Sequence, residues 1–437
     1  MKPEGFAEIV IWYYIVFTLV LFFLGAQFIA GPALAWILFA WLLRKLLAQS
    51  DETPLEDRIT IPIGIWIWIC CILVIGFVLI IGLFDFGYSP TKIVKSFINF
   101  FLRTWALLAL FPLAGCLKVR PQIIFRAVCI LCLQCLILTI ISYGAHFAGI
   151  ELPQYTSTLL AKIGGIGEGY YEVSLFFLEQ GEKFRLTLFA PWAPALAFAG
   201  NIFFFLAKEE SNKFWRFAGM SSSALLVWGS ASRLGLLCLI SLPFIIFVLS
   251  NLARPSMQFT AAVGSFISGL FGYRIISGLQ DLKAYLDNLR ASSTRVREDL
   301  ASMALYYWRT DAPIWGHGLK PSRGPEVVNF MPLGSHHTWL GLLYVHGIVG
   351  LIAFIIPIVY SFVELTIKSQ NSKIARTGLT MLLILLIFSI GENLETLAYI
   401  YWPGLVMLGI ALKESPSNEK GVVKYYSENS LNSSHPL

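Results

Sequence analysis

The sequence predicts an all-α fold, a polytopic helical membrane protein with about 12 transmembrane helices and one large loop of amphipathic helices. Composition is the first reason, because 57% of the 437 residues are hydrophobic and only 13% are charged. Soluble domains carry about 25% charged residues. The second reason is that continuous apolar runs recur, each long enough to cross a bilayer core of about 30 Å. These features exclude a soluble enzyme, a disordered chain, a repeat solenoid, a sequence-specific DNA-binding protein and, because the runs do not alternate, a β-barrel.

The apolar runs that we expect to span the membrane begin near the N-terminus and continue almost to the C-terminal tail. They cover residues 9–24, 28–47, 61–84, 93–117, 123–147, 186–207, 214–229, 234–249, 259–271, 337–365, 374–390 and 394–412. The run 259–271 is short for a span, and without it every later segment would have the opposite orientation. The first run lacks a cationic leader and a small-residue cleavage site, so we expect an uncleaved span and not a signal peptide.

Lysine and arginine are concentrated in alternate loops, which is the usual bias toward the cytoplasm. With the N-terminus in the cytoplasm, the short opposite loops near Gly25 and Glu392 are nearly free of both residue types. An even number of spans then leaves both chain ends inside. The formal net charge of +6 comes from these scattered residues, so we expect no nucleic acid partner. The cations assigned to the cytoplasmic side are Arg44, Lys45, Arg58, Lys118, Arg120, Arg126, Lys208, Lys213, Arg216, Arg254, Lys368, Lys373, Arg376, Lys413, Lys420 and Lys424.

The chain divides into two bundles and a tail. Residues 1–185 form the predicted N-terminal transmembrane bundle with a first outer loop from about 148 to 185, and residues 186–412 form a core with a second outer loop at 272–335. Residues 413–437 are rich in Ser, Asn, Lys and Glu, and we expect a disordered cytoplasmic tail. Apolar residues in the second loop repeat at helical spacing, which predicts two amphipathic helices on the outer face. They are Leu282, Tyr285, Leu286 and Leu289, and then Leu300, Met303, Ala304, Tyr307 and Trp308.

Cysteine usage gives no disulfide framework, because the seven cysteines lie almost entirely in apolar runs. Cys129, Cys132 and Cys135 are three residues apart and therefore share one helical face. No polar ligand accompanies them, so a helix–helix contact explains them better than a metal or iron–sulfur site. We expect no metal and no cofactor.

Arg233 lies between two apolar runs, in the segment Ser230-Ala231-Ser232-Arg233-Leu234-Gly235. An arginine near the bilayer centre costs about 2.5–3.5 kcal/mol on insertion scales, and intramembrane charge usually marks a pathway or a site. The alternative is an interfacial anchor whose guanidinium extends toward water. The small neighbouring residues would let the planar guanidinium approach an anion such as phosphate, to which arginine binds with two hydrogen bonds.

Arg295 and Arg297 precede a helical pattern in the second outer loop. At helical spacing, Arg297 projects on the apolar side with Leu300 and Ala301, whereas Arg295 projects on the polar side with Glu298. A charge that faces a packed surface needs a partner, so Arg297 is the better candidate for binding a ligand. Arg295 fits a solvated surface charge.

His336 and His337 open the apolar run that starts at residue 337, with Ser335 as the expected helix N-cap. A helix N-terminus favours anions, and the ordinary histidine pKa of about 6.5 suits a general base. A capping or interfacial role is the alternative for either histidine. No second ligand motif accompanies them, so zinc is not expected. We expect His317 in a turn, and His346 at a helix contact.

Two arginines and a histidine at one face fit a particular chemistry. The arginines would neutralise a diphosphate leaving group, while the histidine would take a proton from an attacking hydroxyl. Glu392 and Glu395 could orient the histidine or bind sugar, or they could be interfacial charges.

At these residues the chain resembles the O-antigen ligase and O-antigen polymerase family of bacterial surface-polysaccharide assembly. One block of resemblance is the segment from Ser230 to Gly235, similar to the Ser-Arg-Gly segment of the family. A second runs from Arg297 through Pro313, Gly316 and Gly318, and a third is Gly334-Ser335-His336 followed by Gly347-Ile348-Val349-Gly350. The blocks span roughly 185–365, and the first five spans match only in being hydrophobic.

The resemblance implies a metal-independent, inverting glycosyl transfer at the periplasmic face of the bacterial inner membrane. The donor would be a glycan linked to undecaprenyl diphosphate, and the acceptor a lipid or another glycan. Arg233 and Arg297 are implied to bind the diphosphate and His336 to be the base. The family often has Asn or Ser where this chain has His337, so His337 remains open as the base, and Arg295 could exchange roles with Arg297. A lipid-linked glycan flippase is the alternative function, and a structural scaffold would leave the long outer loop without a purpose.

Overall fold

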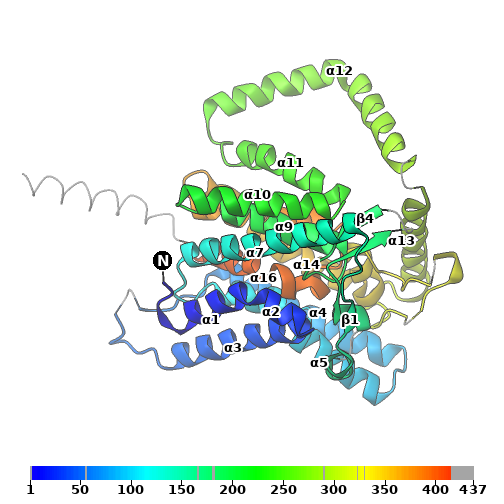
Figure 1. Cartoon of the computed structure of the whole chain (residues 1–437), viewed down its shortest axis with the longest axis horizontal. Helices are drawn as coiled ribbons and strands as arrows, with labels where there is room; N and C mark the ends of the chain where they lie inside the picture. The colour runs from blue at the N-terminus through cyan, green and yellow to red at the C-terminus, as the bar shows by residue number, and fades with distance from the viewer. Residues whose placement is uncertain are drawn as a thin grey trace, which may run out of the picture.

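The computed structural model is mostly helical and describes residues 2–54, 57–164, 167–179, 183–288, 291–321, 323–328 and 330–414. In Figure 1 most helices run side by side, with the N-terminus at one end and the strands and α13 at the other. The helices are α1 Gly5–Val16, α2 Thr18–Phe23, α3 Gln27–Leu47, α4 Ile63–Asp85, α5 Pro90–Arg103, α6 Leu107–Ala114, α7 Pro121–Ala148, α8 Thr158–Gly164, α9 Ala193–Lys208, α10 Lys213–Gly229, α11 Arg233–Leu249, α12 Pro255–Asn288, α13 Ala291–Asp311, α14 Thr338–Ser369, α15 Lys373–Phe388 and α16 Leu394–Lys413, with short 3₁₀ turns η1 Glu168–Tyr170 and η2 Glu326–Val328.

Six helical segments in the described part of the chain are long and apolar enough to cross a membrane. They are Gln27–Leu47, Ile63–Asp85, Pro90–Ala114, Pro121–Ala148, Thr338–Ser369 and Leu394–Lys413. Three further apolar helices, α1, α9 and α11, are shorter. The structure is therefore that of a mostly helical protein with several candidate membrane-spanning helices. About 12 spans stays a prediction, because most of the other predicted runs form helices below the length of a typical span and the run 259–271 lies inside the longer α12 Pro255–Asn288.

Four short strands accompany the helices, so the structure is mostly helical and not purely helical. The strands are β1 Tyr155–Thr156, β2 Glu172–Val173, β3 Phe176–Glu179 and β4 Lys183–Leu186. β1 pairs with β2 and β3 pairs with β4, both antiparallel. The strands lie in the predicted first outer loop and at its boundary with the next predicted span, and at two to four residues each they are too short to give a clear sequence pattern.

The boundary predicted at residue 272 falls inside one helix, which corrects the proposed short span 259–271. α12 is 34 residues long and continues from Pro255 to Asn288, because no proline interrupts it after its first residue. It arches away from the other helices in Figure 1, and Phe259, Phe266 and Leu270 are exposed on it. The side chains predicted as the first amphipathic face, Leu282 to Leu289, lie outside the described residues, as does the predicted disordered tail beyond residue 414.

The centre of the bundle is α16, whose side chains are almost all buried. It contacts α3, α4, α6, α7, α9, α14 and α15. Close approach of α16 to α6 requires Gly409, because an added Cβ would meet the carbonyl of Pro112. The three cysteines of α7 are also buried, and Cys129 lies directly against Gly219 of α10. The predicted helix–helix contact is thus confirmed for Cys129.

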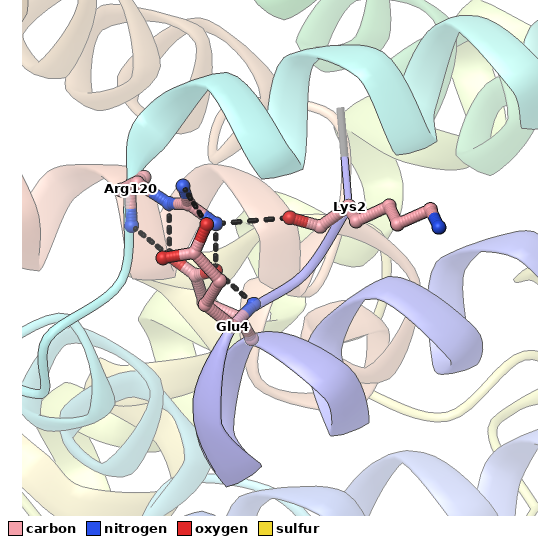
Figure 2. Close-up of polar contacts among 4 residues, drawn as sticks. Lys2, Glu4 and Arg120 are labelled. Atoms are coloured by element: carbon pink, nitrogen blue, oxygen red, sulfur yellow. Dashed lines mark hydrogen bonds and ion pairs between the residues drawn. The ribbon is translucent and has the colours of Figure 1, made fainter.

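An ion-pair cluster ties α1 to the start of α7 at the end of the bundle that holds the N-terminus. Arg120 donates through Nε and Nη2 to the two carboxylate oxygens of Glu8, at 2.8 and 2.6 Å. Figure 2 shows the same guanidinium reaching Glu4 and the backbone oxygen of Lys2. Glu8 is buried, so Arg120 compensates a carboxylate that water cannot reach.

Contacts at the two ends of α16 separate Lys413, one of the predicted cytoplasmic cations, from the start of α14. Beside the Arg120 cluster, Lys413 Nζ donates to the carbonyl oxygen of Cys116 at 2.7 Å. At the other end, Thr338 Oγ1 donates to the carbonyl oxygen of Glu392 at 2.7 Å and accepts from the Leu394 N–H at 3.0 Å. The start of α14 is therefore fixed to the turn between α15 and α16.

α14 is broken at Gly347, and a loop fills the break. Gly347 has φ +60° and ψ −164°, a conformation open to glycine alone. The loop that follows α13 forms hydrogen bonds with the interrupted backbone of α14. The loop residue Gly318 donates its N–H to the carbonyl oxygen of Val345 at 2.9 Å, and the helix residue Ile348 donates its N–H to the carbonyl oxygen of the loop residue Pro313 at 3.0 Å. The predicted glycine-mediated contact is therefore with a loop, because the atoms nearest to an added Cβ at Gly347 belong to Ile314 and Gly316.

We expect Gly347→Ala to destabilise the protein by about 2–4 kcal/mol, since the new Cβ would both strain the backbone and strike the carbonyl of Ile314. Gly144→Ala on α7 is the matched control, because nothing lies within 4 Å of its Cβ position. Thermal unfolding of the purified protein in detergent measures both. Equal melting temperatures for the two variants would contradict the close docking of this loop.

Candidate functional site

Arg297 and His336 line one small cleft at the loop-bearing end of the bundle. The cleft has a volume of about 50 Å³ and lies between α13 and the first turn of α14. Its lining residues are Arg297, Leu300, Ala301, Gly334, Ser335, His336, His337, Leu340 and Ile390. Arg297 is exposed and His336 is half-buried, so a ligand can reach a guanidinium and an imidazole together. The residues are 39 positions apart in the chain, and folding alone brings them together.

The backbone around His336 is unusual. His336 has φ +59°, a left-handed conformation that non-glycine residues adopt rarely and that is often found at functional sites. His337 is the N-cap of α14, and its Nδ1 accepts from the Leu340 N–H at 3.4 Å. The prediction that Ser335 caps this helix is therefore wrong. Ser335 Oγ is buried instead, with no hydrogen-bond partner among the described residues, and it lines the cleft.

The surroundings of His336 favour the neutral imidazole. Burial, and then the positive charges of Arg297 and Lys320, lower the pKa of His336 to about 4. His336 is therefore neutral at physiological pH and has a free ring nitrogen to accept a proton. An anion bound to Arg297 and Lys320 would cancel their charges and raise the basicity of His336. His337 also has a lowered pKa, owing to burial.

A buried carboxyl, Glu392, lies beside this cleft in the turn between α15 and α16. Trp192 Nε1 donates to its Oε2 at 2.8 Å. Burial raises the pKa of Glu392 to about 7, against the opposing effects of the Trp192 hydrogen bond and the charges of Arg297 and Arg185. A carboxyl with this pKa can hold or release a proton near neutral pH. Glu392 is thus a second group at this end of the bundle that is suited to proton transfer.

The raised pKa of Glu392 predicts a pH-dependent stability. The folded protein holds this proton more tightly than the unfolded chain does, so stability is fully present below about pH 4.5 and falls as pH rises through about 7. Glu392→Gln removes the charge and keeps an oxygen for Trp192. We expect the variant to melt several degrees higher than the wild type at pH 8, with no gain at pH 4.5. Glu326→Gln, at an exposed carboxyl, is the control, and parallel pH profiles for Glu392→Gln and the wild type would contradict the prediction.

The other predicted arginines take different positions. Arg233 is the first residue of α11, exposed, and directly follows the Ser232 N-cap. The next residue, Leu234, contacts the position of Gly391, so Arg233 belongs to the same end of the bundle as the cleft. Arg295 is exposed on α13 and does not line the cleft.

Residues that sequence reasoning missed surround the predicted ones. Arg185 is buried on β4, pairs with Glu179 and donates through Nε to the carbonyl oxygen of Ser230 at 3.1 Å. It therefore holds the segment before Arg233, a role that nothing in the local sequence indicates. Lys320 adds charge beside His336. His317, predicted in a turn, is buried and stacks on Tyr344 with ring centroids 4.2 Å apart, which makes it part of the docked loop.

Comparison of the chain with protein-family models and with curated proteins found no match.

Proposed function

We propose that the protein is a membrane glycosyltransferase that moves a glycan from an undecaprenyl-diphosphate carrier to an acceptor hydroxyl, as O-antigen ligases and polymerases do. The observation that carries the proposal is the common cleft of Arg297 and His336, with a neutral imidazole beside a guanidinium. A guanidinium commonly binds a phosphate group with two parallel hydrogen bonds, and a neutral imidazole accepts a proton. The proposed localisation is the bacterial inner membrane, with the cleft at the periplasmic face.

In the proposed reaction the acceptor hydroxyl oxygen attacks the anomeric carbon of the donor sugar. The bond between that carbon and the diphosphate oxygen breaks, and its electron pair leaves on the diphosphate. The hydroxyl proton passes to His336. Arg297 stabilises the negative charge of the leaving group, which is usually the largest single contribution to rate enhancement. Arg233, which lies at the same end of the bundle but does not line the cleft, is the proposed second contact to the diphosphate. The released products are undecaprenyl diphosphate and the glycosylated acceptor.

Reconstitution in liposomes tests this function against the flippase alternative. The purified full-length protein is mixed with a defined donor lipid and two competing acceptors, a lipid core and a free glycan. A transferase yields glycosylated acceptor and undecaprenyl diphosphate in equal amounts, and the preferred acceptor distinguishes a ligase from a polymerase. Movement of intact donor between leaflets, with no product, would contradict the proposal and favour a flippase.

A further inference from the structure

A second pocket lies on the other side of the first turn of α14. It has a volume of about 350 Å³, within the range of small-molecule sites. α5 contributes Asn99, α14 contributes His346, α16 contributes Glu395, and the loop after Gly318 contributes Lys320. Leu340 lines the cleft and Gly341 lines this pocket, so adjacent residues of α14 face the two hollows.

Three polar atoms in this pocket lack a partner. Asn99 Oδ1, His346 Nδ1 and Glu395 Oε2 are buried and make no hydrogen bond within the described residues. His346 is 2% exposed and Glu395 7% exposed. A buried polar atom without a partner is destabilising, and three in one hollow indicate that a ligand or water supplies the missing bonds.

The chemistry of these atoms selects the ligand. Asn99 Oδ1 and Glu395 Oε2 only accept hydrogen bonds, so the ligand must donate. A phosphate would leave both unsatisfied and would face the Glu395 carboxylate. A cationic amine would face Lys320, which already pairs with Glu395 Oε1 at 3.4 Å, and Lys95, which also lines the pocket. Sugar hydroxyls both donate and accept, and the ring carbons pack on aromatic side chains such as Trp105, which also lines the pocket.

We propose that this pocket binds a sugar ring of the glycan handled at the neighbouring cleft, with Asn99, His346 and Glu395 receiving its hydroxyl groups. The proposal rests on the proposed function for its biological meaning, since the pocket and the cleft share the first turn of α14. Lys320 connects them physically: it binds Glu395 in the pocket and lowers the basicity of His336 in the cleft. A ligand in the pocket that contacts Lys320 or Glu395 would thus change the basicity of the His336 imidazole in the cleft.

Sugar binding is measured on the purified full-length protein in detergent by ligand-detected NMR, with glucose, N-acetylglucosamine and glucuronic acid as separate probes. We expect at least one sugar to bind the wild type. Asn99→Leu removes one accepting atom and should weaken binding about tenfold or more. No binding of any probe to the wild type, or equal affinity for wild type and Asn99→Leu, would overturn the proposal.

A second pair of variants tests the proposal independently, in case Asn99→Leu does not fold. Ser96 lies half-exposed at the rim, so Ser96→Trp should fill the pocket and abolish sugar binding, whereas Ser96→Ala should leave it unchanged. Unchanged sugar binding in Ser96→Trp would overturn the proposal. Binding of inorganic pyrophosphate, measured in parallel, reports on the cleft: its absence would count against the proposed function while leaving the sugar pocket supported, so the two failures are distinguishable.

Discussion

His336→Ala is expected to lower glycan transfer by about 10²–10⁴-fold, the usual contribution of a positioned general base. The protein should still insert in membranes and bind donor lipid, because the N-cap of α14 is His337 and not His336. The measurement is the initial rate of product formation with purified variants at saturating donor. Wild-type rates in His336→Ala would show that another group, with Glu392 as the first candidate, accepts the proton.

His337→Asn is the matched control for this prediction. Asparagine is a preferred N-cap, so it preserves the start of α14 while removing the second imidazole. We expect a change of less than about threefold in rate, within the range of a peripheral substitution. A larger loss in His337→Asn than in His336→Ala would assign the base to His337.

Arg297→Ala is expected to lower transfer by about 10²–10³-fold, since removal of one donor to a developing negative charge costs that much in other sites. Arg297→Lys should recover only part of the activity, because an ammonium group cannot form two parallel hydrogen bonds with a diphosphate. Steady-state rates over a range of donor concentration separate a loss of binding from a loss of turnover.

Arg295→Ala on the same helix is the control for Arg297→Ala. Arg295 is exposed and does not line the cleft, so its loss should change the rate by less than about threefold. If Arg295→Ala lost as much activity as Arg297→Ala, the two arginines would share the donor or exchange roles.

Local periodicity was sufficient to place some of the candidate site. Helical spacing put Arg297 on the side of Leu300 and Ala301, and in the structure all three line the cleft. The start of the helix near residue 337 was also predictable from the onset of an apolar run. The sequence places the N-cap two residues early, because it does not display the left-handed backbone of His336 or the packing of Gly334 against Gly341.

Features that depend on distant segments were not predictable from the sequence. The raised pKa of Glu392 requires its burial and the hydrogen bond from Trp192, 200 residues away. The break in α14 requires the loop around Gly316, whose glycine lies against Gly347. The apolar run 259–271 underestimates the length of α12, because a polar continuation keeps helical geometry when no breaker intervenes.

The most direct test of a shared diphosphate site is a pH titration of His336 by NMR with isotope-labelled histidine, with and without inorganic pyrophosphate. The chain has six histidines, and His336→Gln assigns the relevant signal. Without ligand, His336 should titrate near pH 4. Pyrophosphate bound at Arg297 should raise this pKa toward the ordinary value of 6.5, because it cancels neighbouring positive charge. The ligand should have no effect in Arg297→Ala. A His336 pKa that does not change when pyrophosphate is added to the wild type, or that changes equally in Arg297→Ala, would contradict a site shared by Arg297 and His336.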